Sequence, residues 1–210
     1  MLIARKQIEL LEPATDYITL SKAKQHLRVT NSLDDAYITD LLSGAFDICS
    51  KYVGYSILKS RWQYGYDYLV GQEAITDLKK GFTIPNGNYL RVMSRVISID
   101  ALKYVDENNA IQTFGASDWI AKPSLMSDYG TSIFIENNPT SLTDDNIRYI
   151  AEITEGFEVA DFPKSIEIAV LQLVQQYYDN RQAIVVGVSQ TEMSFNFKYI
   201  LDSFRIPVFV

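Results

Sequence analysis

The chain lacks most of the residues and motifs on which enzymes and metalloproteins depend. Its 210 residues include one cysteine, Cys49, and one histidine, His26. This excludes an internal disulfide and the zinc motifs that need several histidines. The sequence contains no glycine-rich phosphate-binding loop and no Gly-x-Ser-x-Gly nucleophile elbow. We therefore expect no catalytic residue, no metal and no cofactor.

Long apolar runs and basic clusters are also missing. No apolar run approaches the roughly 20 residues that cross a bilayer, and the first six residues lack the apolar core of a signal peptide. The formal net charge is −7, and only Arg5-Lys6 and Lys79-Lys80 place two cations side by side. Because affinity for DNA comes from clustered lysine and arginine, we expect no specific DNA binding. We also expect no membrane contact and synthesis in the cytoplasm.

The sequence does supply enough apolar residues for a folded core. Hydrophobic residues make up 47% of the chain, with 14 tyrosines and 10 phenylalanines, so a chain of this length needs no covalent staples. The patterning predicts an α+β protein in which helices from both ends form a small bundle around a β-rich insertion. We expect the helical domain to comprise residues 1–57 plus 161–210, and the inserted domain residues 58–160.

Helical periodicity dominates the first part of the chain. Residues 19–28 form the first expected helix, with Thr19 as a plausible N-cap and apolar residues at spacings of three and four. The second should cover residues 34–52, where carboxylates at its start favour the positive end of the helix dipole. Gly54 follows in the position where glycine commonly ends a helix.

Short runs rich in tyrosine, valine and isoleucine follow, and these are typical of strands. Residues 97–105 and 111–114 flank a turn-forming segment and predict a hairpin. The other expected strands cover residues 61–68, 82–85, 132–135 and 147–153. Helix is expected again from Pro163 through Tyr178 with Asp161 as its cap, and a last short helix over residues 197–204.

Four groups of residues invite a chemical interpretation, and each has a simpler structural one. His26 lies in the last turn of a short helix, where the dipole favours it. Cys49 lies within an apolar stripe, which predicts a buried, unreactive thiol. Asp34-Asp35 opens a helix and Asp144-Asp145 lies in a turn, and adjacent carboxylates diverge too far to chelate a metal as a pair. We expect all four to be structural.

The C-terminal tail is unusually apolar for a chain end, since termini normally fray unless something holds them. It either packs on the protein's own core or docks on a neighbouring subunit by strand addition or groove insertion. A second, weaker interface candidate is the apolar segment around residues 184–186. The candidate contact residues for another protein subunit are therefore Phe204, Arg205, Ile206, Pro207, Val208, Phe209, Val210, Ile184, Val185 and Val186.

Two segments near the N-terminus resemble the phage head–tail connector (adaptor) family. Residues 17–29 (YITLSKAKQHLRV) and 34–42 (DDAYITDLL) match the two helical motifs that open its members, and further matches follow at Ala45, Tyr52, Gly54 and Trp62. Val53 and Tyr55 depart from the family's commoner Thr and Arg. Residues 162–170 (FPKSIEIAV) and 201–206 (LDSFRI) are similar to its C-terminal motifs.

The resemblance covers both helical ends, in the family's order, and resembles the longer members in its β-rich middle. It implies a structural virion protein of the phage neck that forms a dodecameric ring beneath the portal protein. It also implies a downstream neck or tail-completion protein below the ring. DNA would pass through the lumen, and the acidic character would keep it from sticking.

Other functions stay open from the sequence alone. The chain could be another neck component, namely a stopper, a tail terminator or a minor head protein. A phage-encoded hydrolase using carboxylates of the β-rich block is a weaker alternative, and a host regulatory binding module is weaker still. A deep pocket with two converging acids would favour the hydrolase.

Overall fold

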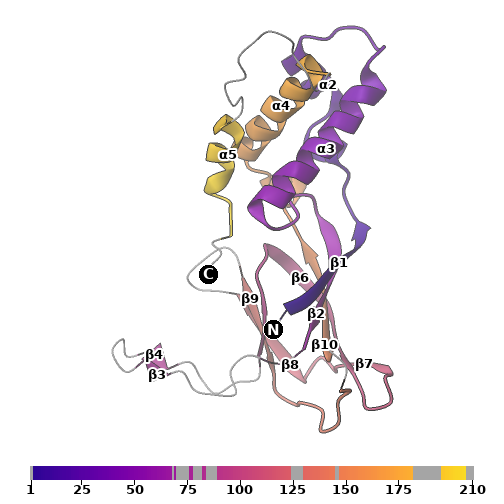
Figure 1. Cartoon of the computed structure of the whole chain (residues 1–210), viewed down its shortest axis with the longest axis vertical. Helices are drawn as coiled ribbons and strands as arrows, with labels where there is room; N and C mark the ends of the chain where they lie inside the picture. The colour runs from indigo at the N-terminus through magenta and orange to yellow at the C-terminus, as the bar shows by residue number, and fades with distance from the viewer. Residues whose placement is uncertain are drawn as a thin grey trace. The chain divides into compact units, whose positions relative to one another are not determined.

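A computed structural model gives the fold of the chain. The residues described are 2–67, 69, 76–77, 82–83, 89–123, 130–144, 147–181 and 195–206. The chain divides into two compact units, each considered by itself below (Figure 1). The β-rich unit contains residues 1–9 and 60–155, and the helical unit contains residues 10–59 and 156–210. The predicted α+β class, with helices contributed by both ends of the chain, is confirmed.

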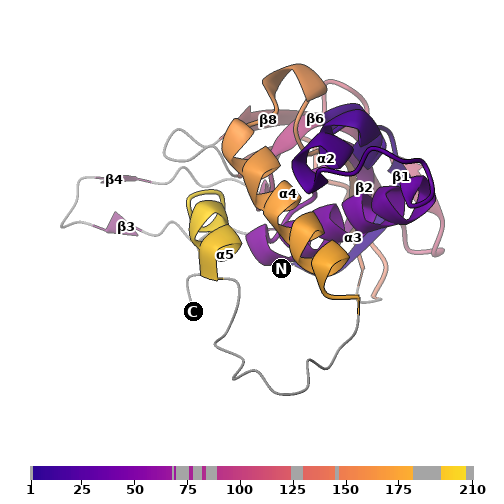
Figure 2. The same cartoon turned by 90° about the horizontal axis from the view of Figure 1, so that it is seen from above.

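The helical unit is built from five α-helices and one 3₁₀ turn among its described residues. They are α1 (Ala14–Tyr17), α2 (Leu20–Leu27), α3 (Asp35–Val53), η1 (Val159–Asp161), α4 (Lys164–Asp179) and α5 (Phe195–Asp202). Helix α4 packs against both α3 and α5. Figures 1 and 2 show α5 on one side of α4 and α3 on the other.

Local capping explains where the N-terminal helices begin and end. The Thr19 side chain accepts a hydrogen bond from the backbone N–H of Lys22, which confirms the predicted cap of α2. Helix α2 ends at Arg28, which adopts a left-handed conformation with φ of 59°. Helix α3 ends at Gly54, with φ of 93°, where a side chain would be strained.

The cap predicted for α4 is wrong. Asp161 belongs to the 3₁₀ turn, and Pro163 takes the N-cap position with no side-chain hydrogen bond to the helix. The backbone N–H of Asp161 donates to the Glu158 carbonyl oxygen at 3.1 Å within that turn.

Aromatic side chains close the helical core between the two ends of the chain. Tyr17, Phe46 and Phe162 pack together with ring centroids 5.1 to 5.9 Å apart. The Tyr17 hydroxyl also donates a hydrogen bond to the carbonyl oxygen of Phe157 at 2.7 Å. Side chains from three distant segments thus meet in one core, which explains why the N-terminal and C-terminal helices fold as one unit.

The β-rich unit contains a five-stranded sheet, a three-stranded sheet and a short two-stranded ribbon. In spatial order the large sheet comprises β1 (Leu2–Leu10), β2 (Ser60–Tyr66), β10 (Tyr149–Glu155), β6 (Val96–Val105) and β7 (Ile111–Thr113). The three-stranded sheet comprises β5 (Tyr89–Val92), β9 (Thr131–Ile135) and β8 (Trp119–Pro123). The ribbon pairs β3 (Thr76–Asp77) with β4 (Phe82–Thr83).

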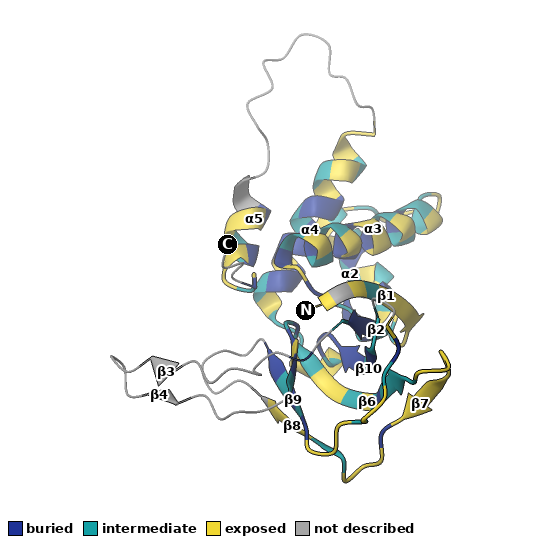
Figure 3. Ribbon diagram, turned by 60° about the horizontal axis from the view of Figure 1, so that its bottom comes forward, coloured by how far each residue is buried: buried dark blue, intermediate teal, exposed yellow. Residues whose placement is uncertain are grey.

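One hydrophobic core joins the two larger sheets. Strand β10 pairs antiparallel with both β2 and β6, with two register shifts along its pairing with β6. The core includes Tyr64 and Ile153 from the large sheet and Leu90 and Ile133 from the small one. Figure 3 shows this interior as buried, while β7 and most of β1 are exposed at the two edges of the large sheet.

A buried ionic cluster holds β1 to the rest of its sheet. The Arg5 guanidinium donates to the carboxylate of Glu155, whose side chain is fully buried. It also lies 4.0 Å from the ring centroid of Trp62. The Tyr64 hydroxyl donates to Glu155 at 2.6 Å, and the Ser94 hydroxyl donates to the same oxygen. Several donors therefore compensate the carboxylate for its loss of water.

The two units divide at places other than the predicted ones. Residues 1–9 were expected in the helical domain, but they form a strand of the β-rich unit. At the other boundaries, residues 58–59 and 156–160 lie in the helical unit rather than in the insertion. Strands β5 and β8 were not predicted. The pairing of β5 with β9, in which Val92 faces Thr131, is non-local, and no short sequence window contains it.

Candidate assembly surfaces

The segment that carries the first motif is held rigidly by ion pairs within the helical unit. Lys24 of α2 contacts Asp35 of α3 at 2.6 Å, and Lys22 contacts Glu167 of α4 at 2.6 Å. Burial alone raises the pKa of Glu167. Hydrogen bonds from Lys22 and Lys164 outweigh that effect and leave its pKa below the usual value. The charged residues of the motif thus fix the position of α2 on its neighbours.

Asp34 links the start of α3 to the end of α4. It accepts a hydrogen bond from the Tyr178 hydroxyl at 2.6 Å and one from Arg181 at 3.0 Å. These hydrogen bonds, that of Tyr178 foremost, hold the pKa of Asp34 below its usual value. Arg181 also stacks on the rings of Tyr37 and Tyr178, 4.7 and 4.8 Å from their centroids. Asp34 therefore has a structural role, as predicted, although its partners are side chains rather than the helix dipole.

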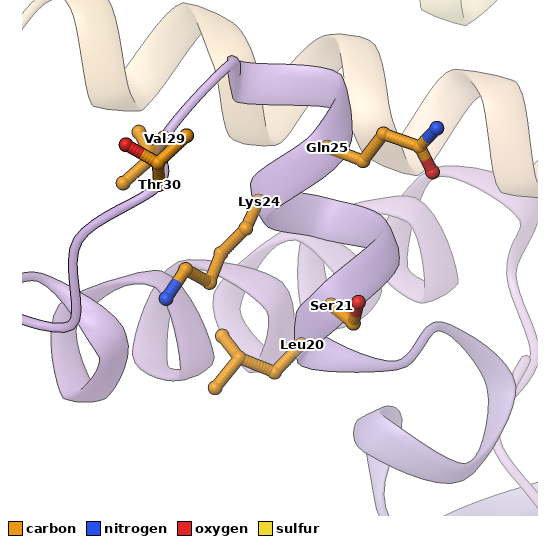
Figure 4. A pocket seen from close by; sticks show the side chains of 6 residues that line it. All are labelled: Leu20, Ser21, Lys24, Gln25, Val29 and Thr30. Atoms are coloured by element: carbon orange, nitrogen blue, oxygen red, sulfur yellow. The ribbon is translucent and has the colours of Figure 1, made fainter.

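A shallow hollow of about 520 Å³ lies against α2 (Figure 4). It is lined by Leu20, Ser21, Lys24, Gln25, Val29 and Thr30. Its one cation, Lys24, is already engaged with Asp35, so the hollow offers no free charge for an anionic ligand.

The single histidine and the single cysteine lie where the sequence predicts. His26 is exposed in the last turn of α2. Cys49 is fully buried in α3, and burial raises the pKa of its thiol to about 12. A thiol with that pKa stays protonated at neutral pH and is a poor nucleophile. Among the described residues, no group of three or more histidine, cysteine or acidic side chains could hold a metal ion.

The described part of the C-terminal tail lies on the chain's own helical unit. The Ile206 N–H donates a hydrogen bond to the carbonyl oxygen of Val53 at 3.1 Å. The Phe204 ring lies edge-on to Phe157 at 6.4 Å, and the Arg205 guanidinium lies 5.4 Å from the ring centroid of Tyr52. The remaining interface candidates, Pro207–Val210 and Ile184–Val186, lie outside the described residues. The interface role of the whole set stays a prediction.

Several large hydrophobic side chains on the helical unit are exposed. The most exposed are Leu33 before α3 at 90%, Tyr199 of α5 at 81% and Ile168 of α4 at 49%. None of these three is among the contact residues predicted from the sequence. The helical periodicity of α4 carries a weak signal for Ile168, which falls outside the main apolar stripe, but the exposure of the other two depends on tertiary packing.

The expectation of no membrane contact can be tested only for helices that might span a membrane. Within the described ranges, no helix combines the length and the apolar character that a membrane span requires.

The order of the N-terminal elements, namely a capped short helix, a turn and a long helix ending at Gly54, is that expected from the resemblance. Residues 17–89 match the model of the phage gp6-like head-tail connector protein family. The resemblance is thereby confirmed over that segment, which contains the first motif, α2, α3 and the start of the β-rich unit. No curated protein gives a match.

Solved structures extend the similarity of fold to nearly the whole chain. One similar chain comes from the neck of an empty gene transfer agent (GTA) particle with C6 symmetry. It has 16% identity and a TM-score of 0.71, over 99% of this chain and 98% of that one. Similar chains come from the neck of the native GTA particle with C12 symmetry, with 14% identity and a TM-score of 0.66, and from the virion of the native particle, with 16% identity and a TM-score of 0.65. Each covers 99% of this chain and 98% of the other. At these identities the matches establish a shared fold, including the β-rich unit that the family model covers only in part.

Proposed function

We propose that this chain is a structural virion protein, a head–tail connector subunit of the neck of a tailed phage or a related particle. One combined observation carries the proposal. The segment that matches the connector family lies within a fold that nearly the whole chain shares with chains from GTA necks. The motif residues Lys22 and Lys24 hold α2 in place, which is a structural use of the motif.

In this proposal the working form is a ring seated beneath the portal protein. A dodecamer is the form that the resemblance implies, and the C6 and C12 symmetries of the similar GTA necks support a ring. The next neck or tail-completion protein would attach below. The tail residues Phe204–Val210 and the segment Ile184–Val186 remain proposed contacts within this assembly.

The charge of the chain suits a channel for DNA. Both units carry more carboxylates than cations, and the acidic excess disfavours adhesion of phosphate backbones. DNA would therefore pass through the lumen without specific binding.

Gene disruption in the particle-producing host tests the proposal. Loss of the chain should leave DNA-filled heads and free tails that do not join, seen by negative-stain electron microscopy, and wild-type protein supplied in trans should restore joining. A matched control restores the gene with Cys49→Ser, which removes the one thiol. Normal particles after disruption would refute the proposal. Joined particles that lack only a lysis or modification activity would favour the hydrolase alternative.

A further inference from the structure

Helix α5 presents a large aromatic side chain to solvent. Phe197 and Leu201 face the helical core, whereas Lys198 and Tyr199 point outward. Tyr199 is 81% exposed, and in the described part of the chain Lys198 has no ion-pair partner. Tyrosine is enriched where proteins contact one another.

Helix α3 presents a complementary surface. Its outward residues from 40 to 47 are small or acidic, namely Asp40, Ser43, Gly44 and Asp47, and the exposed Lys51 follows one turn later. A Cβ atom added at Gly44 would meet nothing within 4 Å. The backbone of α3 is therefore open to close approach by a bulky side chain from another molecule.

Each surface also carries one charge without an ion-pair partner in the described part of the chain, and these two charges are opposite in sign. Asp47 pairs loosely with Lys51 at 3.6 Å. Asp40, like Lys198, forms no ion pair with any described residue. Complementary charges at a contact bring the correct surfaces together and disfavour wrong partners.

Within one copy, α5 contacts the C-terminal end of α3, where Tyr52 meets Phe197 and Asp202, but Tyr199 stays exposed and does not cover Ser43 and Gly44. The outward residues of α3 point away from its buried stripe, and those of α5 point away from Phe197 and Leu201. One copy therefore does not pair the two surfaces with each other, but a head-to-tail contact between copies can use each once. Such heterologous contacts close into rings when the rotation allows it.

From these observations we infer that a second copy of this chain is the partner of both surfaces. Tyr199 of one copy packs on Ser43 and Gly44 of the next, and Lys198 pairs with Asp40. The inference rests on the proposed function, because it assigns the contact that builds the proposed ring.

Charge reversal with rescue tests the contact. Lys198→Glu and Asp40→Lys are made singly and together, and the copies bound per portal ring are counted by mass photometry. Each single variant should reduce ring occupancy about tenfold at subsaturating concentration, since like charges would then face each other, and the double variant should recover most of it. Lys6→Glu, on exposed β1, is the matched control and should leave occupancy unchanged.

Gly44→Trp provides a second test that does not depend on charge. The fold should tolerate it, because the added side chain enters open space, so the thermal unfolding midpoint should not fall. Ring occupancy should fall at least as far as with the charge reversals. If all these variants form rings with the occupancy of the wild type, the inferred contact is overturned and the proposed function stands. A wild-type chain that never binds the portal would overturn both.

Discussion

The buried pair of Arg5 and Glu155 gives the sharpest prediction about stability. Glu155 is fully buried, and the Arg5 side chain is 27% exposed. Arg5→Ala would leave a carboxylate in the core without its cation. Removal of one partner from a buried ion pair costs about 3–5 kcal/mol. We expect the β-rich unit to lose about that much free energy of unfolding.

An exposed pair in the same sheet supplies the control. Arg61 contacts Glu9 at 3.7 Å and Asp100 at 3.5 Å, and its side chain is 37% exposed. Arg61→Ala should therefore cost only about 0.2–1 kcal/mol. Arg5 and Arg61 lie on neighbouring strands, and they differ in how deeply their acidic partners are buried.

Tryptophan fluorescence during urea unfolding is the assay. Both tryptophans, Trp62 and Trp119, belong to the β-rich unit, so the signal reports on this unit even if the helical unit unfolds separately. The double variant Arg5→Ala with Glu155→Gln should lose less than the sum of the two single changes, because no charge is left unpaired. A loss for Arg5→Ala no larger than that for Arg61→Ala would refute the reasoning.

Three further predictions follow. Cys49 should react with a thiol reagent at pH 8 only as fast as the protein unfolds, because its pKa of about 12 and its burial keep it protonated and inaccessible; prompt labelling of folded protein would contradict this. Because the pKa of Glu167 is depressed in the folded state, its ionised carboxylate stabilises the fold at pH values above the ordinary glutamate pKa. That stabilisation disappears as the pH falls through the folded-state pKa. The difference in unfolding free energy between wild type and Glu167→Gln should therefore shrink from pH 7 to pH 3, and a constant difference would refute it. Gly156→Ala should cost more than about 1 kcal/mol in circular dichroism melts, because φ is +119° and a Cβ would lie 2.6 Å from the Leu58 carbonyl oxygen; an unchanged melt would contradict the close approach.

The helices were largely predictable because their signals are local. Thr19, Gly54 and the apolar stripe of α3 each act within a few residues, and the structure confirms all three. The hairpin of β6 and β7 was predictable for the same reason, since its turn lies between the two strands. Local patterns were misleading at Asp161, where a 3₁₀ turn and a proline replaced the expected cap.

The first strand could not be predicted because its defining contact is distant. Arg5 and Lys6 make residues 2–10 look like a polar chain start, yet Arg5 finds its partner at Glu155, 150 residues away. The same limit applies to the candidate contact surfaces. The motif located α2 and α3 correctly, but the exposure of Tyr199 depends on how α5 packs on α4.

Native mass spectrometry of the portal ring from the same particle, with and without this chain, tests the connector assignment most directly. The account predicts a closed ring of this chain on each portal, with twelve copies if the stoichiometry implied by the family resemblance holds. A portal from an unrelated phage should bind none. A chain that stays monomeric in the presence of its own portal would contradict the assignment.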